Sequence, residues 1–150
     1  MLYLGADHNG YFLKEKLKIF LQGLAIAYQD LGAYKFQKSD DYVDFAVKVG
    51  RALKKVDLGI LICGSGHGMV IAANRLAGVR AAMPINPTSA RDGRHDDHLN
   101  VVVLAAWETG SRQAEKIVKA FIKQIPGQGK RYLRRLKKIQ ALEKTNGPKN

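Results

Sequence analysis

A glycine-rich loop directly after a short apolar run is the feature that most constrains the fold of this chain. Residues 60–63 read Ile-Leu-Ile-Cys, residues 64–68 read Gly-Ser-Gly-His-Gly, and a helix-like stretch follows at 70–74. The apolar run predicts a buried strand, and glycines let a backbone approach a ligand closely with successive N–H groups pointing at it. The pattern therefore predicts a site for an anion or an oxyanion, and the only cysteine of the chain, Cys63, lies at its start.

Strand-like and helix-like segments alternate along the whole chain. The expected strands are residues 2–4, 25–28, 58–63, 79–83 and 101–105. The expected helices are residues 11–22, 42–54, a short one that ends near 76, 110–125 and 131–144. Such alternation predicts parallel strands with right-handed crossovers, and continuous apolar strands suit a sheet covered on both faces. We therefore expect an α/β fold with a five-stranded parallel sheet.

Ligands of such sheets bind beyond the carboxyl ends of the strands, at a topological switch point. Asp7 and His8 follow the first expected strand, residues 63–68 follow the third, and residues 86–89 form a loop after the fourth. We therefore expect these three loops to meet at one edge of the sheet.

The length of 150 residues indicates one domain, which we divide into a main part, 1–125, and a linker with a basic C-terminal helix, 126–150. The formal net charge is +12, and residues 111–150 hold twelve Lys or Arg against two acidic residues. Such a segment suits nucleic acid, an acidic partner or a phosphorylated small molecule, although a solvated helix face explains most of its lysines. Nucleic-acid binding is disfavoured because no recognition motif or interleaved aromatic residues accompany the charge.

Composition also bears on location and cofactors. No apolar run of about 18 residues occurs, which predicts no membrane span. The N-terminus lacks the pattern of a signal peptide, and a single cysteine forms neither an internal disulfide nor a four-cysteine zinc site. We therefore expect a cytoplasmic protein with no metal and no cofactor.

Six short motifs, in this order, carry a family resemblance. They are Gly-Ala-Asp-His-Asn-Gly at 5–10, Asp-Tyr-Val-Asp-Phe-Ala at 41–46, Gly-Ile-Leu-Ile-Cys-Gly-Ser-Gly at 59–66, Ile-Ala-Ala-Asn at 71–74, Gly-Val-Arg-Ala-Ala at 78–82 and Pro-Thr-Ser-Ala at 87–90. The set, which covers roughly residues 1–140, resembles the type B ribose 5-phosphate isomerases and the related galactose 6-phosphate isomerase subunits. The resemblance implies a Rossmann-like αβα sandwich and metal-free aldose–ketose isomerisation of a sugar phosphate in carbohydrate metabolism. It also implies a homodimer or dimer of dimers, with active sites between subunits and the C-terminal helix extending to a partner.

The glycine loop suits that chemistry. Isomerisation needs a base that moves a proton between C1 and C2, and Cys63 is the candidate because N–H donors near a helix N-terminus lower the pKa of a thiol. The backbone of Gly64, Gly66 and Gly68 is the candidate oxyanion hole, and Ser65 is a candidate proton relay or substrate hydrogen-bonding group. The alternative for Cys63 is a small buried apolar residue at a strand end.

The resemblance implies three further substrate-binding residues. The family implies that Asp7 contacts sugar hydroxyls, that His8 contacts the phosphate or a hydroxyl, and that Tyr42 lies near the pocket. From the residues alone, Asp7 and His8 are equally well a helix cap and a turn residue, and Tyr42 is the start of an amphipathic helix.

The family carries a His-Asn-Asp-x-Asn pattern whose histidine helps to open the sugar ring and whose last Asn binds substrate. Without gaps, that histidine falls on Asp96 here, with His95 and His98 on either side, while Asn100 fits the last position. Either His95 or His98 takes over the role, or ring opening is done differently, for example by Asp96 as a base. The alternative is a set of polar loop residues.

A second departure concerns the phosphate. Arg131 and Arg135 match a family Arg-His-x-Arg-Arg pattern, share a helical face and suit a bidentate grip on phosphate, whereas the family's histidine is Tyr132. Trp107 stands where the family has a phosphate-site arginine; it suits stacking on a sugar or core packing. His67 stands inside the glycine loop and is a candidate substrate contact.

We therefore predict a sugar-phosphate isomerase with Cys63 as its base, specific for a pentose or hexose phosphate that the sequence does not identify. The alternative is a non-catalytic relative that binds a phosphorylated metabolite or a protein partner. Trp107 and Asp96 motivate that alternative, because both depart from the pattern at positions expected near the substrate.

Overall fold

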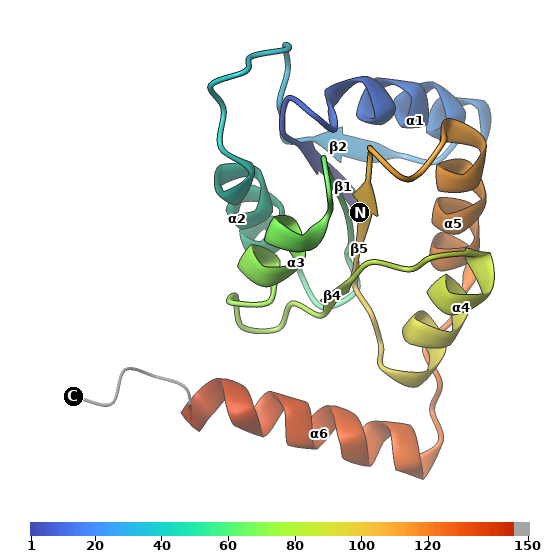
Figure 1. The fold of residues 1–150 in the computed structure, drawn as a ribbon. Helices are drawn as coiled ribbons and strands as arrows, with labels where there is room; N and C mark the ends of the chain where they lie inside the picture. Colours follow the sequence, from blue (N-terminus) through green and yellow to red (C-terminus); the bar gives the residue numbers. More distant parts are fainter. Residues whose placement is uncertain (146–150) are drawn as a thin grey trace.

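A five-stranded, fully parallel sheet forms the centre of the molecule, shown here by a computed structural model that describes residues 1–145. Its strands are β1 (Leu2–Ala6), β2 (Tyr28–Asp30), β3 (Leu58–Cys63), β4 (Ala81–Ala82) and β5 (Val101–Ala105). They lie in the order β2-β1-β3-β5-β4 (Figure 1). The expected five-stranded parallel sheet is confirmed, and β3 and β5 have the predicted bounds.

Helices cover both faces of the sheet, as Figure 1 shows. They are α1 (Tyr11–Gly23), α2 (Tyr42–Ala52), α3 (His67–Ala73), α4 (Pro87–Asp96), α5 (Ser111–Lys123) and α6 (Lys130–Thr145). One apolar cluster joins α1, α4 and α5 to the sheet, and a second joins α2 and α3 to the opposite face. The chain is therefore the predicted αβα sandwich.

Helical spacing of apolar residues explains the covering layers. Leu13, Leu17 and Leu21 of α1 recur every fourth residue and are all buried against the sheet. Helix α2 begins at a capped turn, where the side chain of Asp41 accepts a hydrogen bond from the Val43 N–H. The apolar spacing predicted both helices, and α2 ends at Ala52, two residues before the expected end at 54.

Strand β4 covers only Ala81–Ala82 of the expected 79–83, and α4 and β2 differ more from the prediction. Residues 86–89 were expected as a loop, but Asn86 caps helix α4, with a reciprocal hydrogen bond to Ser89 and Pro87 in its first turn. Strand β2 was expected at 25–28 and lies at 28–30, because the connection from α1 continues through Ala25, whose φ is +54°. In both cases the polar, partly exposed sequence gives little periodic signal.

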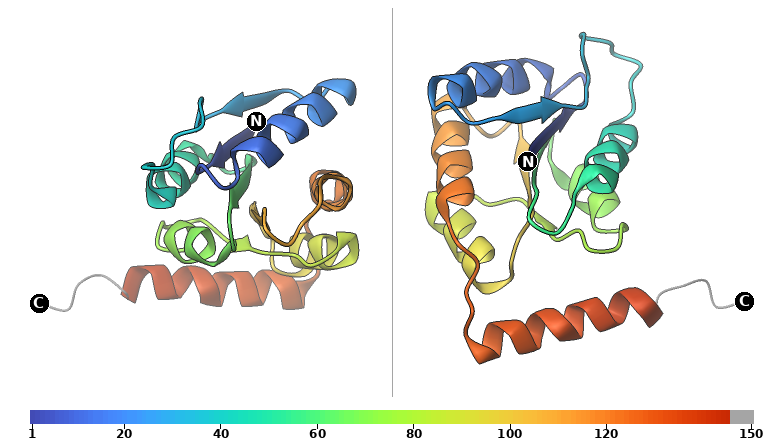
Figure 2. Two further views of the ribbon diagram at one scale, coloured as in Figure 1. Left: turned by 45° about the horizontal axis from the view of Figure 1, so that its top comes forward. Right: turned by 180° about the vertical axis from the view of Figure 1, so that it is seen from behind.

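Helix α6 lies apart from the sandwich, beneath the end of the sheet at which the strands begin (Figures 1 and 2). Residues 124–129 connect it to α5, and the predicted Pro-Gly-Gln-Gly linker is part of that connection. Near its far end, Glu143 Oε1 accepts a 3.0 Å hydrogen bond from the Gly78 N–H, before β4. The last five residues of the predicted 126–150 segment lie outside the described residues. Within residues 1–145, none of the helices has the length and apolarity needed to cross a membrane.

Candidate active site

The switch point of the sheet lies between β1 and β3. The chain after β1 enters α1 on one face, whereas the chain after β3 enters α3 on the other. The two loops touch: the Asp7 N–H donates to the Ile62 carbonyl at 3.2 Å, and Gly10 lies against the same carbonyl, where no side chain would fit. The predicted meeting of the loops after the first and third strands is therefore observed, and it brings Asp7 beside the end of β3. The third segment of that prediction, residues 86–89, forms the start of α4.

Cys63 is buried at this point, with 4% of its surface exposed. Burial raises the pKa of its thiol, while hydrogen bonds from the backbone N–H groups of Gly66 and Met69 to the sulfur lower it, and the neighbouring Asp7 raises it further. The pKa therefore lies above its usual value. The lowering contribution of the loop is present as expected, but the expectation of a lowered pKa is wrong, because desolvation outweighs it.

The three glycines of the loop are each closed in by a side chain. A Cβ on Gly64 would lie 2.5 Å from the Trp107 ring, and one on Gly68 would lie 2.6 Å from the Tyr42 ring. Gly66 has φ +81°, which disfavours any L side chain, and Met83 at the end of β4 packs against it. Tyr42 and Trp107 thus border the loop at two different glycines, and the pocket position of Tyr42 stays a prediction.

His8 is held in one orientation at the same edge. Its Nδ1 lies 2.7 Å from Asp40 Oδ1, and its Nε2 lies 3.0 Å from the amide nitrogen of Asn9. Since an amide nitrogen donates, Nε2 accepts and Nδ1 donates to Asp40 in the neutral ring. The other Asp40 oxygen is buried without a hydrogen-bond partner in the structure. Asp40 was not among the predicted site residues, because it belongs to the loop that enters α2.

Asp7 points its carboxylate back at its own loop. Its Oδ1 accepts a 2.9 Å hydrogen bond from the Gly10 N–H. Asp7 therefore stabilises the turn before α1, which is the structural alternative expected for it from the sequence alone. Burial raises the pKa of Asp7, and the Gly10 N–H and the adjacent His8 lower it only in part. Ser65 is half-buried and His67 is exposed within the loop after Cys63.

The predicted ring-opening and phosphate-binding residues gather elsewhere. His95, near the end of α4, has Nδ1 2.7 Å from Asp96 Oδ1 and meets the ring of Tyr132 edge-on. Arg131 stacks on that tyrosine ring with 4.7 Å between its guanidinium and the ring centre, while Arg135 is exposed on the same helix. Because α4 follows β4 and leads back to the start of β5, this group lies at the amino ends of the strands.

His98 and Asn100 belong to that same edge. The His98 Nε2 donates to the Gly127 carbonyl at 2.7 Å, which fixes the linker to α6. The Asn100 side chain accepts from the Arg80 N–H at 2.7 Å and donates to the Gly78 carbonyl at 2.8 Å, so it ties the start of β4 to the start of β5. Within one chain, neither residue is brought to Cys63, which ends its strand at the opposite edge.

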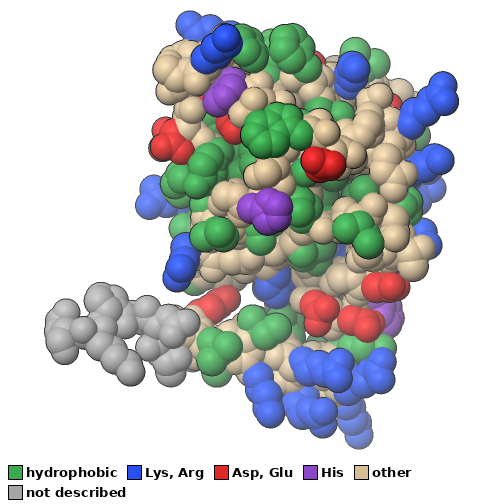
Figure 3. Space-filling model, in the orientation of Figure 1, with side chains coloured by type: hydrophobic (Ala, Val, Ile, Leu, Met, Phe, Trp, Pro, Cys, Tyr) green, Lys and Arg blue, Asp and Glu red, His purple; other side chains and the backbone are tan. Residues whose placement is uncertain are grey.

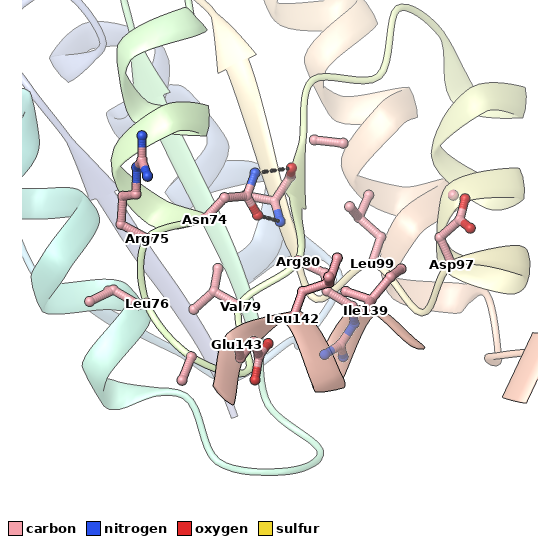
Figure 4. A pocket seen from close by; sticks show the side chains of 14 residues that line it. Asn74, Arg75, Leu76, Val79, Arg80, Asp97, Leu99, Ile139, Leu142 and Glu143 are labelled. Atoms are coloured by element: carbon pink, nitrogen blue, oxygen red, sulfur yellow. Dashed lines mark hydrogen bonds between the residues drawn. The ribbon is translucent and has the colours of Figure 1, made fainter. Parts of the chain in front are cut away.

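A hollow of about 560 Å³ opens between α6 and the sandwich at this second edge (Figure 4). Apolar side chains from both sides line it, including Leu76, Leu99 and Ile139, with Arg80 and Glu143 among its charged residues. Figure 3 shows that Lys and Arg side chains gather over α6. The basic charge predicted for the C-terminal segment therefore lies next to His95 and away from Cys63.

In residues 1–145, no three His, Cys, Asp or Glu side chains are grouped so that they could hold a metal ion. What the fold does assemble is a buried thiol with N–H donors at a switch point, and a separate basic group that contains His95, Arg131 and Tyr132. The first group suits proton transfer beside an oxyanion, and the second suits an anion such as phosphate.

Known proteins share this architecture over nearly its full length. A family model described as ribose/galactose isomerase matches residues 2–139. A probable ribose-5-phosphate isomerase B of Mycoplasma genitalium is 38% identical over 146 residues, which is 95% of each chain. The crystal structure of a ribose 5-phosphate isomerase from Thermotoga maritima has a TM-score of 0.88 at 40% identity and covers 93% of this chain and 97% of its own. A crystal structure of the M. genitalium enzyme with bound ribulose-5-phosphate has a TM-score of 0.89 at 38% identity and covers 95% of each chain.

The fold and these relatives define an α/β enzyme of the aldose–ketose isomerase class, an intramolecular oxidoreductase. The chain belongs to the ribose/galactose isomerase family. The resemblance read from the six motifs is thereby confirmed, and the roles of individual site residues stay predictions.

Proposed function

We propose that this chain interconverts an aldose phosphate and a ketose phosphate through an enediolate, without a metal ion, and that Cys63 is the base. The substrate is a phosphorylated pentose of the ribose 5-phosphate/ribulose 5-phosphate type or a related hexose phosphate. The observation that carries the proposal is the Cys63 thiol, buried at the switch point and contacted by the N–H groups of Gly66 and Met69. A cytoplasmic location is part of the proposal and accords with a single unpaired cysteine.

The proposed reaction needs few groups. The Cys63 thiolate takes the proton from C2 of the open-chain aldose, the electron pair forms the C1–C2 double bond, and the carbonyl oxygen becomes an enediolate oxygen. Backbone N–H groups of residues 64–68 stabilise that oxygen, and a proton moves from the C2 hydroxyl to O1, for which Ser65 is the nearby hydroxyl. The thiol then returns its proton to C1, which yields the ketose and restores the thiolate.

His8 is proposed to bind the substrate beside this thiol. Its ring is held by Asp40 and Asn9 at 2.7 and 3.0 Å, so its orientation is set before substrate arrives. Asp7 and Tyr42 border the same space and are proposed to contact sugar hydroxyls. His67 is exposed in the loop and is the remaining candidate contact.

We further propose that the site is completed by a second copy of the chain. His95, His98, Arg131 and Arg135 lie at the amino ends of the strands, whereas Cys63 ends a strand at the opposite edge, so one chain does not unite them. Helix α6 carries Arg131 and Arg135 away from the sandwich on a six-residue connection, where they suit the phosphate of a substrate bound by a partner. A homodimer or a dimer of dimers satisfies this requirement.

Activity on a panel of pentose and hexose phosphates tests the proposal, with Cys63→Ser as the size-matched variant. We expect turnover of at least one aldose phosphate, with solvent deuterium incorporated at C1 of the ketose, and a loss of about 10²-fold or more in kcat in the variant. Chelator treatment should leave the activity unchanged. Wild-type activity in Cys63→Ser would refute the role of the thiol, and binding of a sugar phosphate without turnover in the native chain would favour the non-catalytic alternative.

A further inference from the structure

Trp107 occupies an unusual position for the single tryptophan of the chain. It follows the end of β5, and its backbone N–H donates to the Gly64 carbonyl at 3.1 Å. Its ring packs on Gly64, so closely that a Cβ there would lie 2.5 Å from it. Even so, 68% of the residue is exposed. One side of the indole is therefore fixed on the residue next to Cys63, and the rest is open to solvent at the same edge of the sheet.

The surrounding backbone holds this ring in place. The Glu108 and Thr109 N–H groups both donate to the Ala105 carbonyl, at 3.1 and 2.8 Å, which forms a tight turn under Trp107. Gly64 leaves the room that the ring needs, because any side chain there would displace it. Packing on Gly64 uses one part of the indole and leaves the rest free, so the ring has a fixed position and a face that suits a ligand.

The chemistry of an indole limits what it can bind. It has no charge with which to pair a phosphate, and its faces suit the apolar C–H side of a sugar, with one N–H donor at its edge. Gly64 directly follows the proposed base, so the ring lies on the part of the loop next to Cys63. Trp107 replaces the arginine that the resemblance implies for the phosphate, and it brings no charge for that role.

Resting on the function proposed above, we infer that Trp107 is a specificity-determining residue that forms an apolar wall against the carbon chain of the substrate near C1 and C2. It acts on binding of the sugar part and leaves binding of the phosphate to other groups. Trp107 should raise the affinity for sugar phosphates with a C–H face at this end and should not affect the affinity for inorganic phosphate.

Fluorescence of the single tryptophan tests this directly, because every change in emission reports on Trp107. The experiment uses the Cys63→Ala chain, which binds without turnover, titrated with ribose 5-phosphate, with a hexose 6-phosphate and with inorganic phosphate. We expect a saturable change with at least one sugar phosphate and none with inorganic phosphate up to the same occupancy. No change with any sugar phosphate that is shown by calorimetry to bind would overturn the inference.

Kinetics of the otherwise native enzyme provide the second readout. Trp107→Ala should raise KM for the preferred sugar phosphate about tenfold, with kcat within about twofold and the inhibition constant of inorganic phosphate unchanged. Trp107→Phe should restore most of the affinity, since it keeps an aromatic face. An unchanged KM in Trp107→Ala, or an equal loss of affinity for inorganic phosphate, would contradict the inference.

The two proposals fail in different ways. If the native chain turns over no sugar phosphate, the proposed function fails, yet a saturable fluorescence change still supports the wall at Trp107. If turnover is present and depends on Cys63, but Trp107 emission does not change on binding and Trp107→Ala leaves KM unchanged, the proposed function is supported and the inference about Trp107 is wrong.

Discussion

At the scale of single residues, Cys63 experiences two opposing effects. Burial raises the pKa of the thiol, and the N–H groups of Gly66 and Met69 lower it by less, so the resting form at neutral pH is the protonated thiol. A proton must therefore leave the sulfur before it acts as a base. The expected pH dependence follows from this direction.

We expect kcat/KM to rise about tenfold per pH unit from neutral pH and to keep rising past the usual thiol value of 9.0. Because Cys63 is the only cysteine, the ultraviolet absorbance of its thiolate reports the same ionisation, with Cys63→Ser as the background for the tyrosines. The pH dependence of kcat/KM and that of the thiolate absorbance should give the same pKa for Cys63. A plateau of kcat/KM below about pH 8 would contradict the assignment of Cys63 as the base, because its thiol should still lose protons above that pH.

Asp40 gives the second residue-scale prediction. Since its Oδ1 holds His8 Nδ1 at 2.7 Å, Asp40→Asn should weaken that hold and raise KM about three- to tenfold while kcat changes less. Asp44→Asn, an exposed carboxylate on α2, is the matched control and should leave KM unchanged. Equal effects of both substitutions would show that only net charge matters.

The contrast between Cys63 and Asp40 shows what a sequence reveals about a site. Cys63 and His8 were predictable as neighbours because Cys63 ends one buried strand and His8 lies two residues after another, and strand ends of a parallel sheet share one edge. Asp40 lies 32 residues from His8 in a loop, 31–41, that has no periodic pattern. The sequence near Asp40 therefore gives no signal that predicts its contact with His8. The pKa of Cys63 was also unpredictable, since it depends on burial that only the packed loop determines.

At the scale of elements, a buried ion pair joins α1 to the edge strand β2. Lys14 is fully buried, its Nζ lies 2.7 and 2.6 Å from the two Asp30 oxygens, and it also donates to the Ala33 carbonyl at 2.7 Å. Burial raises the pKa of Asp30, but hydrogen bonds from Lys14, the Gly32 N–H and Lys18 outweigh it, so the pKa lies below its usual value. These bonds hold the start of the loop that carries Asp40.

Lys14→Met should therefore destabilise the protein by about 3 kcal/mol, because it leaves Asp30 without its buried partner. Lys16→Met, an exposed position on the same helix, should change the free energy of unfolding by less than about 0.5 kcal/mol. Urea denaturation of the wild type and both variants at neutral pH measures the difference. A loss below about 1 kcal/mol in Lys14→Met would contradict the account.

Acid should reduce this difference. A carboxylate whose pKa is lowered by folding contributes stability above its unfolded pKa, and that stability is lost as the pH falls through the folded pKa. The gap between wild type and Lys14→Met in urea should therefore narrow below about pH 4. A gap that is constant with pH would indicate a loss of packing alone.

Elements were predictable where one face is continuously apolar. Strands β3 and β5, which are buried on both faces, were placed at their observed bounds, as was the start of α2 at Tyr42. Helix α4 was missed because Ala90 is its only fully buried residue, although Asn86, Pro87 and Ser89 together are a recognisable cap. For such a polar helix the terminal signal is informative and the periodicity is not.

At the scale of the whole molecule, the two halves of the predicted site lie at opposite edges of one sheet. Cys63, His8 and Trp107 gather where the strands end. His95 gathers with Arg131 and Tyr132 of α6 where the strands begin. Cys63, His8, His95 and Arg131 were candidate site residues from the sequence, but the sequence could not show that one chain keeps the two groups apart. The proposed pairing of two copies would bring one group from each chain into a shared site.

The central claim is an isomerase site shared between two copies, and mixing two inactive variants tests it most directly. One variant is Cys63→Ala, and the other is Arg131→Ala with Arg135→Ala. Each alone should be nearly inactive, but after subunit exchange by partial denaturation and refolding, mixed dimers contain one intact site. We expect recovery of about a quarter of the wild-type activity, since half of the dimers are mixed and half of their sites are intact. Absence of any recovery, with mixed dimers shown to form, would contradict the shared site.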